Sequence, residues 1–143
     1  MRVTATFEVT GWEQAAVDEP AEGLPRSRAT VTKTFTGEVE ATSSAELLMC
    51  GQVAYTAQER VVGQVGGRVG SFLIQHGAVT GDASDAEGRP VAGGVVVPGS
   101  GTGELTGIAG TVAYRHDETG AVFTLDYELG EGGADGVPAQ AAT

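Results

Sequence analysis

The sequence predicts an all-β protein folded as an antiparallel barrel of about eight strands. Apolar and polar residues alternate along most of the chain, which is the pattern of a half-buried strand. No segment shows the period of an amphipathic helix. Glycines lie inside the predicted strands, above all in the stretch 95–110, and barrels use such glycines to turn corners. The 143 residues correspond to a single domain.

The first half of the chain contains three predicted strands and a hairpin turn. Strands are expected over 3–10, 30–40 and 53–61, where valine, alanine and phenylalanine alternate with threonine and glutamate. The acidic stretch 13–25 contains two prolines and is expected to be a long loop between the first two strands. The two glycines at 66–67 predict a tight hairpin turn into a fourth strand.

The second half continues the same pattern. Further strands are expected over 91–97, 105–116 and 121–129, and the polar stretch 81–90 is a connection long enough to cover a barrel mouth. The barrel domain therefore spans 1–129. Residues 130–143 are rich in glycine and alanine without large apolar side chains, which predicts a flexible tail.

The charge balance excludes several classes of partner. Nineteen acidic and eight basic residues give a net charge of −11, and the basic residues form no cluster. Nucleic acids and anionic membrane surfaces are bound mainly through basic side chains, so neither is expected as a partner. No apolar leader or membrane-length segment is visible, and the single cysteine, Cys50, has no internal disulfide partner. A cytoplasmic protein is expected.

Three stretches carry a resemblance to a known family. They are RATVTKTFTG at 28–37, GRVGSFLIQH at 67–76 and VVPGSGTGEL at 96–105. In this order they resemble a family of small bacterial proteins of unassigned function that adopt an allene-oxide-cyclase-like barrel. The Gly101-Thr102-Gly103 element is also similar to the signature of plant dirigent proteins and allene oxide cyclases.

The resemblance implies an eight-stranded antiparallel barrel, often oligomeric, whose lumen can hold an apolar ligand. Proteins of this fold include cyclases of fatty-acid epoxides, dirigent proteins that guide radical coupling, and cyclases of polyketide intermediates. In them an apolar cavity holds a flexible substrate in one shape and few polar groups take part. The resemblance transfers no catalytic residue, because the matching family has none assigned.

Three ionisable residues lie on predicted apolar strand faces. Lys33, Glu59 and His76 share their faces with valine, phenylalanine and isoleucine, so they are candidate catalytic residues in the lumen. Burial would shift their pKa values towards the neutral forms unless they pair with one another. A Glu59 with a raised pKa would transfer protons to or from a substrate. The alternative is that they reach solvent at a rim or form an ordinary salt bridge.

Aromatic and aliphatic residues on the same faces are the candidate ligand contacts. Trp12 either gates an opening or packs at a rim. The candidate ligand-binding residues are Trp12, Phe35, Tyr55, Phe72, Ile74, Tyr114, Phe123 and Tyr127. A metal site is not expected, because His76 and His116 are the only histidines and no short metal-binding spacing is present. No cofactor is expected.

Three functions remain open at this stage. The first is a cofactor-independent cyclase or isomerase acting on an apolar biosynthetic intermediate, and the second is a carrier or sensor of a small apolar ligand. The third is a structural, oligomeric barrel with a filled interior. A homodimer is expected, because glycine-bent sheets leave apolar outer faces for a partner to cover.

Overall fold

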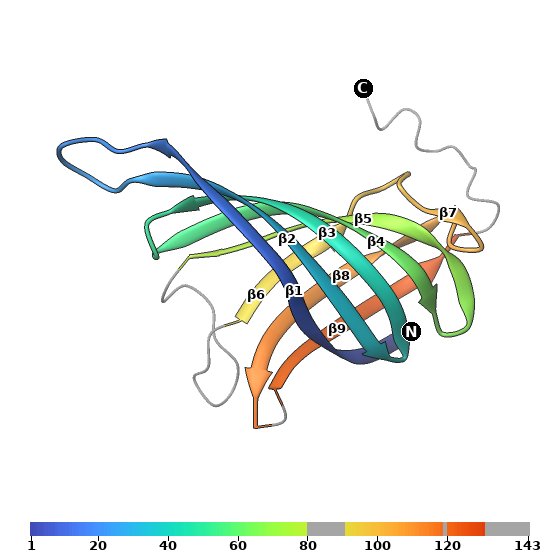
Figure 1. The fold of residues 1–143 in the computed structure, drawn as a ribbon. Helices are drawn as coiled ribbons and strands as arrows, with labels where there is room; N and C mark the ends of the chain where they lie inside the picture. Colours follow the sequence, from blue (N-terminus) through green and yellow to red (C-terminus); the bar gives the residue numbers. More distant parts are fainter. Residues whose placement is uncertain (80–90, 119, 131–143) are drawn as a thin grey trace.

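The protein is a closed antiparallel barrel of eight strands with one short additional strand outside the ring (Figure 1). This computed structural model describes residues 1–79, 91–118 and 120–130. The strands of the described chain are β1 (Arg2–Asp18), β2 (Arg26–Gly37), β3 (Val39–Cys50), β4 (Ala54–Val65), β5 (Arg68–Val79), β6 (Val91–Val96), β7 (Thr102–Gly103), β8 (Ile108–Asp117) and β9 (Gly120–Leu129).

Neighbouring strands follow one another around the ring in the order β1, β2, β3, β4, β5, β6, β8 and β9. Pairing of β9 with β1 closes the ring, and β7 pairs with β5 outside it. All of these pairings are antiparallel, as the sequence predicts. No helix in the described part of the chain is long and apolar enough to cross a membrane.

The hairpin between β4 and β5 confirms the turn predicted at 66–67. Gly66 and Gly67 have φ values of 56° and 90°, a conformation that side-chain-bearing residues rarely adopt. The strands on either side pair in continuous register from Val65 with Arg68 to Ala54 with Val79.

The first six residues of the stretch predicted as a loop at 13–25 are strand. β1 continues to Asp18 and pairs with β2 up to Arg26, so only residues 19–25 form the connection. An ion pair of 2.8 Å between Arg26 Nη2 and Asp18 Oδ2 joins the two strand ends. The β1–β2 hairpin therefore projects beyond the rest of the barrel as an arm (Figure 1). Pairing with β2 keeps residues 13–18 in a strand, although their polar composition predicted a loop.

Two strand predictions in the first half of the barrel need correction. The predicted strand 30–40 is divided at Gly37, because the chain turns a corner there between β2 and β3. The strand over 41–50 was not predicted, because the inward side chains in its first part, Ala41, Ser43 and Ala45, are small or polar. The inward-facing residues of β3 include Val39, Ser43 and Ala45.

The glycine-rich stretch is also different from the prediction. The strand expected over 105–116 begins only at Ile108, and the preceding residues form turns next to β7. A Cβ atom at Gly70 would overlap the carbonyl oxygen of Thr102, so glycine is required where β7 crosses β5. Leu105 and Ile108 are buried at this end of the barrel, which they close.

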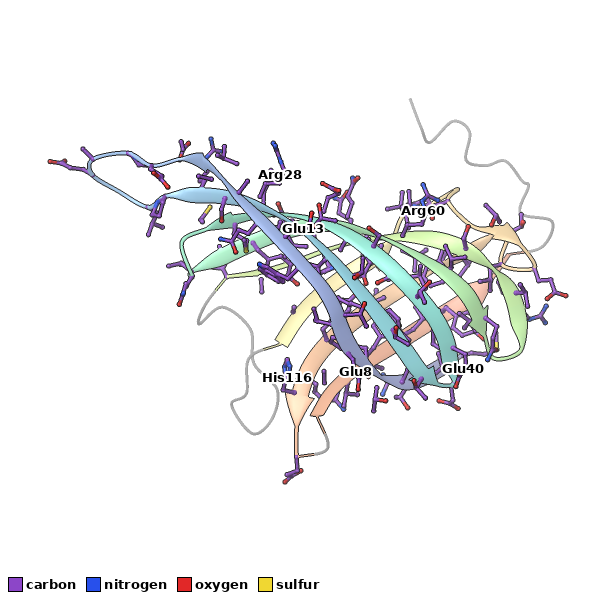
Figure 2. The ribbon with its side chains drawn as sticks, in the orientation of Figure 1. Glu8, Glu13, Arg28, Glu40, Arg60 and His116 are labelled. Carbon is purple, nitrogen blue, oxygen red and sulfur yellow. The ribbon has the colours of Figure 1, made fainter. Side chains whose placement is uncertain are left out.

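The main core fills the half of the lumen next to this closed end. Its largest fully buried side chains are Phe35, Phe72, Ile74, Leu105, Ile108, Phe123 and Leu125. Phe35 and Phe123 pack edge to face with their ring centroids 5.0 Å apart. A smaller cluster of Ala29, Val31 and Ala45 lies between β2 and β3. Charged residues such as Glu40 and Arg60 lie on the outer surface (Figure 2).

The predicted lid at 81–90 and the predicted tail from 131 onward lie outside the described residues.

Candidate functional site

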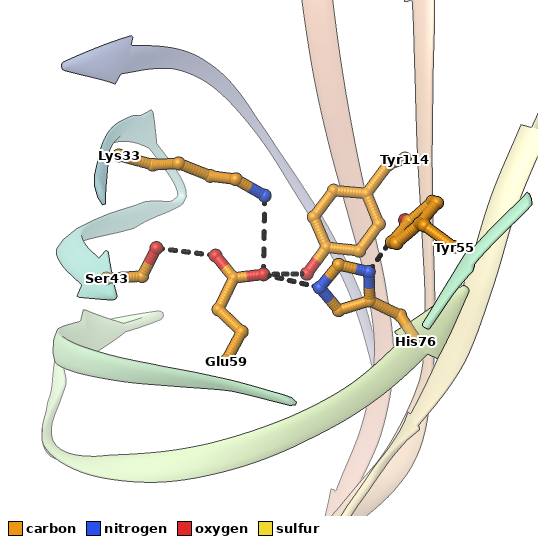
Figure 3. A network of polar contacts seen from close by, with 6 residues as sticks. All are labelled: Lys33, Ser43, Tyr55, Glu59, His76 and Tyr114. Carbon is orange, nitrogen blue, oxygen red and sulfur yellow. Dashed lines mark hydrogen bonds and ion pairs between the residues drawn. The ribbon is translucent and has the colours of Figure 1, made fainter. Parts of the chain in front are cut away.

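A buried carboxylate, Glu59 of β4, is the centre of a polar cluster inside the barrel (Figure 3). Its Oε1 atom lies 3.3 Å from Lys33 Nζ, 2.9 Å from His76 Nε2 and 2.7 Å from the Tyr114 hydroxyl. The Ser43 hydroxyl donates a hydrogen bond to Oε2. Glu59 therefore receives hydrogen bonds from four other strands, β2, β3, β5 and β8.

The strand register explains why these side chains meet. Lys33 and Ser43 are direct cross-strand partners on β2 and β3. Glu59 lies opposite Ala45, and His76 lies opposite Ala57, so small residues leave room beside each large polar group. Alternation along each strand turns all of these side chains towards the lumen.

The electrostatics of Glu59 favour the ionised form. Burial alone would raise its pKa, but hydrogen bonding from His76, the charge of Lys33 and the hydroxyls of Ser43 and Tyr114 together lower it to about 2. The sequence predicted a raised pKa for Glu59 unless Lys33, Glu59 and His76 pair with one another. In the structure Glu59 pairs with both Lys33 and His76. Glu59 is thus a permanent carboxylate rather than a proton donor at neutral pH.

The neighbouring groups respond differently to the same burial. Burial lowers the pKa of Lys33 more than the attraction of Glu59 raises it. Burial, together with the charge of Glu59, raises the pKa of Tyr55 to about 12 and that of Tyr114 well above its usual value. Both tyrosines therefore keep their hydroxyl protons. The Lys33 ammonium also lies 4.4 Å from the centroid of the Tyr114 ring.

His76 links the buried carboxylate to Tyr55. A carboxylate only accepts hydrogen bonds, so His76 carries a proton on Nε2, the atom that faces Glu59. Its other nitrogen, Nδ1, lies 2.8 Å from the Tyr55 hydroxyl. When the imidazole is neutral, Nδ1 accepts a hydrogen bond from the Tyr55 hydroxyl. When the imidazole is protonated, Nδ1 donates a hydrogen bond to the Tyr55 oxygen. Glu59, His76 and Tyr55 thus form one hydrogen-bonded chain.

This chain ends at a pocket of about 470 Å³, which we call the mouth pocket. The pocket lies at the end of the barrel from which the β1–β2 arm projects, and Lys33, Tyr55, His76 and Tyr114 border it. Glu59 does not border it. Most of the remaining wall is apolar, and it consists of Phe7, Val9, Trp12, Val31, Leu47, Met49, Val53, Ala54, Ala78, Val79 and Ala92 with Gly51, Gln52, Arg115 and His116. Its size and lining suit a small organic molecule.

The predicted site residues divide between the two halves of the lumen. Lys33 and His76 border the mouth pocket, as do Trp12, Tyr55 and Tyr114, whereas Glu59 lies behind its wall. Trp12 is half exposed at the rim. The other five predicted ligand residues are buried in the packed half and do not border this pocket: Phe35, Phe72, Ile74, Phe123 and Tyr127.

Ser43 and much of the pocket wall were missed by the sequence analysis. Ser43 belongs to the strand that was not predicted, and its only signal was alternation among small residues. Val9 and Val31 lie in predicted strands, but nothing in the sequence placed them at the mouth. His76 and His116 both border the pocket, yet the described residues contain no group of three or more metal-ligating side chains.

Comparison with known proteins assigns the chain to a family. The model of the family described as "Protein of unknown function (DUF3224)" matches residues 3–129. The chain belongs to the DUF3224 family. A crystal structure of a DUF3224 protein of unknown function from Shewanella oneidensis MR-1 is similar, with 31% sequence identity and a TM-score of 0.73. The similarity covers 92% of this chain and 98% of that one.

No protein with a curated description matches the sequence. The protein is thus a barrel of the DUF3224 family.

Proposed function

We propose that this DUF3224 barrel binds a small apolar molecule in the mouth pocket and moves a proton within it, as a cofactor-independent isomerase or cyclase. The observation that carries this proposal is the hydrogen-bonded chain from Glu59 through His76 to Tyr55, which ends on the pocket wall. A proton-transfer group next to an apolar binding site is the minimum that such a reaction needs.

The hydrogen-bonded chain of Glu59, His76 and Tyr55 can remove a proton from a bound molecule. The Tyr55 oxygen accepts a proton from an acidic C–H or O–H group, while the Tyr55 hydroxyl proton passes to His76 Nδ1. The electron pair of the broken bond stays on the substrate. The resulting imidazolium is stabilised by the Glu59 carboxylate, 2.9 Å from Nε2. Tyr55 remains a neutral phenol throughout, in keeping with its raised pKa.

Return of the proton completes an isomerisation or a ring closure. The imidazolium gives its Nδ1 proton back to the Tyr55 oxygen, and the hydroxyl delivers a proton to a different atom of the substrate. The apolar wall holds the flexible intermediate and keeps water away. His76 and Tyr55 are the catalytic residues of this proposal, and Glu59 is a positioning residue. Lys33 keeps Glu59 ionised.

A general test uses 5-nitrobenzisoxazole, an apolar probe that opens to a coloured cyanophenolate when a base removes its C–H proton. The wild-type protein is expected to accelerate this reaction, and Tyr55→Phe and His76→Ala are expected to slow it about 100-fold. Tyr127→Phe is the matched control, because Tyr127 lies in the packed half, and it should keep the wild-type rate. Equal rates for Tyr55→Phe and Tyr127→Phe would reject the proton-transfer mechanism.

Binding is tested separately from proton transfer. Ala78→Phe places an aromatic ring on the pocket wall, whereas Val69→Phe places one on the exposed part of the same strand, away from the pocket. Trp12 is the only tryptophan and borders the pocket, so its fluorescence reports occupancy. Apolar probes should change the signal in the wild type and Val69→Phe but not in Ala78→Phe. Binding without any effect of Tyr55→Phe or His76→Ala on turnover would favour a carrier.

A further inference from the structure

The chain contains a single lysine, and that lysine borders the mouth pocket. Lys33 is buried, with 8% of its surface exposed, on the inner face of β2. Arg115 also borders the pocket, but its Nη1 atom lies 3.5 Å from Thr124 Oγ1 on β9. Lys33 is therefore the cation whose charged group belongs to the interior cluster.

The Lys33 ammonium has donor capacity that the described residues do not use. An ammonium has three N–H donors, and one of them is directed to Glu59. The ammonium also faces the Phe7 and Tyr114 rings, with centroids 4.9 and 4.4 Å away. Aromatic faces attract a cation but accept hydrogen bonds only weakly. An oxygen atom in the pocket would be a better acceptor.

The charges around the pocket favour a negatively charged oxygen. The described residues that border it include no aspartate or glutamate, although the chain has 19 acidic residues. Glu59 lies behind the wall and pairs with Lys33, so the charged side chains that border the pocket itself are those of Lys33 and Arg115. A negatively charged oxygen in the pocket is attracted by both cations.

We infer that the ligand of the mouth pocket is an apolar molecule with one acidic oxygen, and that this oxygen binds to Lys33 Nζ. This inference rests on the proposed function, because it concerns the same pocket. The acidic oxygen is a carboxylate, or it is the enolate or phenolate that forms when Tyr55 and His76 remove a proton. In both cases the negative charge lies next to the ammonium, which stabilises it.

The test compares matched probes by titration calorimetry. Naphthalene-1-acetate and its uncharged amide differ in the acidic oxygen, and 2-naphthol and 2-methoxynaphthalene form the second pair. The wild type is expected to bind naphthalene-1-acetate at least about tenfold more tightly than the amide. The ratio of affinities between 2-naphthol and 2-methoxynaphthalene is compared with the ratio between the acetate and the amide. A larger ratio in the naphthol pair would identify the enolate or phenolate as the preferred source of the charge.

The variants separate the role of Lys33 from the stability of the fold. Lys33→Met alone leaves Glu59 as a buried, unpaired charge, so the informative variant combines Lys33→Met with Glu59→Gln. The amide oxygen that Glu59→Gln introduces still accepts hydrogen bonds from His76 and Tyr114. The double variant should bind the amide as the wild type does and should bind the acetate within about twofold of the amide.

Two results would overturn the inference. The first is a wild type that binds acid and amide equally, and the second is a preference for the acid that survives in the double variant. In both cases the proposed small-molecule function would still stand if the wild type binds the uncharged probes and Ala78→Phe does not. If none of the four probes binds, both the inference and the proposed pocket function are rejected.

Discussion

The two halves of the lumen are built from the same strands but have opposite characters. In the closed half, phenylalanine, leucine and isoleucine side chains fill the space between the sheet walls. In the mouth half, the same strands carry Lys33, Ser43, Glu59 and His76, and a pocket of about 470 Å³ remains. On β2, Phe35 belongs to the closed half and Lys33, two residues away, belongs to the mouth half. The closed half supplies packing energy, which offsets the cost of the polar groups buried in the mouth half.

The polar cluster around Glu59 lies where the two halves meet. Replacing Glu59 should have the largest effect on the stability of the fold. Glu59→Leu leaves the Lys33 ammonium and the Tyr114, Ser43 and His76 donors without their acceptor. We expect a loss of about 3–5 kcal/mol in the free energy of unfolding, measured by urea denaturation.

Two controls accompany this variant. Glu59→Gln keeps the acceptor oxygen and should cost clearly less than Glu59→Leu. Glu46→Leu changes an exposed glutamate on β3 and should stay within about 0.5 kcal/mol of the wild type. If Glu59→Leu is no more costly than Glu46→Leu, the cluster does not stabilise the fold.

A matched pair of leucine substitutions compares the halves directly. Leu125→Ala removes a fully buried side chain from the closed half and should cost about 2–5 kcal/mol. Leu47→Ala removes a partly buried side chain from the pocket wall, where space already exists, and should cost about 1 kcal/mol. Equal losses in urea denaturation would mean that the mouth half is as tightly packed as the closed half.

Acid should weaken the mouth half through Glu59. Its folded-state pKa of about 2 lies below its ordinary value of 4.5, so the stabilisation is present above pH 4.5 and is lost as the pH falls towards 2. Full protonation removes on the order of 3 kcal/mol, of which about 2 kcal/mol is lost by pH 3. Urea denaturation between pH 7 and pH 3 should show this slope in the wild type and a smaller one in Glu59→Gln. Parallel curves for the two proteins would contradict the lowered pKa.

Loss of the Tyr55 hydroxyl, at the end of the hydrogen-bonded chain, should have only a small effect on stability. Tyr55→Phe removes one partly buried hydrogen bond, to His76 Nδ1, and should cost about 1 kcal/mol in unfolding free energy. Its effect on 5-nitrobenzisoxazole turnover should be far larger. A variant that loses stability and turnover in proportion would indicate that Tyr55 is only a structural residue.

Alternation along the strands predicted the all-β barrel, although not the face of every residue, because β1 has a register shift between Val9 and Gly11. It placed Lys33, Glu59 and His76 on apolar faces, and the structure brings all three into contact around one carboxylate. Alternation cannot give the level of a residue along the barrel axis, because that depends on strand tilt and register. Phe35 and Phe72 were therefore assigned to the ligand site although they lie in the packed half.

Other features were hidden because the relevant side chains are small or polar. Strand β3 was not predicted, and with it Ser43 was missed, because Ala41, Ser43 and Ala45 do not form a strongly apolar face. The end of β1 was predicted as a loop because acidic residues and prolines are typical of loops. Its strand conformation is stabilised by pairing with β2, which is a tertiary effect.

The arm formed by β1 and β2 can change length without disturbing the ring. Among the described strands, β9 pairs with β1 only from Arg2 to Thr6, and the outer part of β1 pairs with β2 alone. Insertion or deletion of two residues in each strand would preserve the inward and outward faces, because side chains alternate with a period of two. Trp12 and Val9 would then move relative to the mouth while the closed half stayed the same. Lengthening or shortening this one hairpin would therefore change the shape of the mouth pocket without altering the packed core.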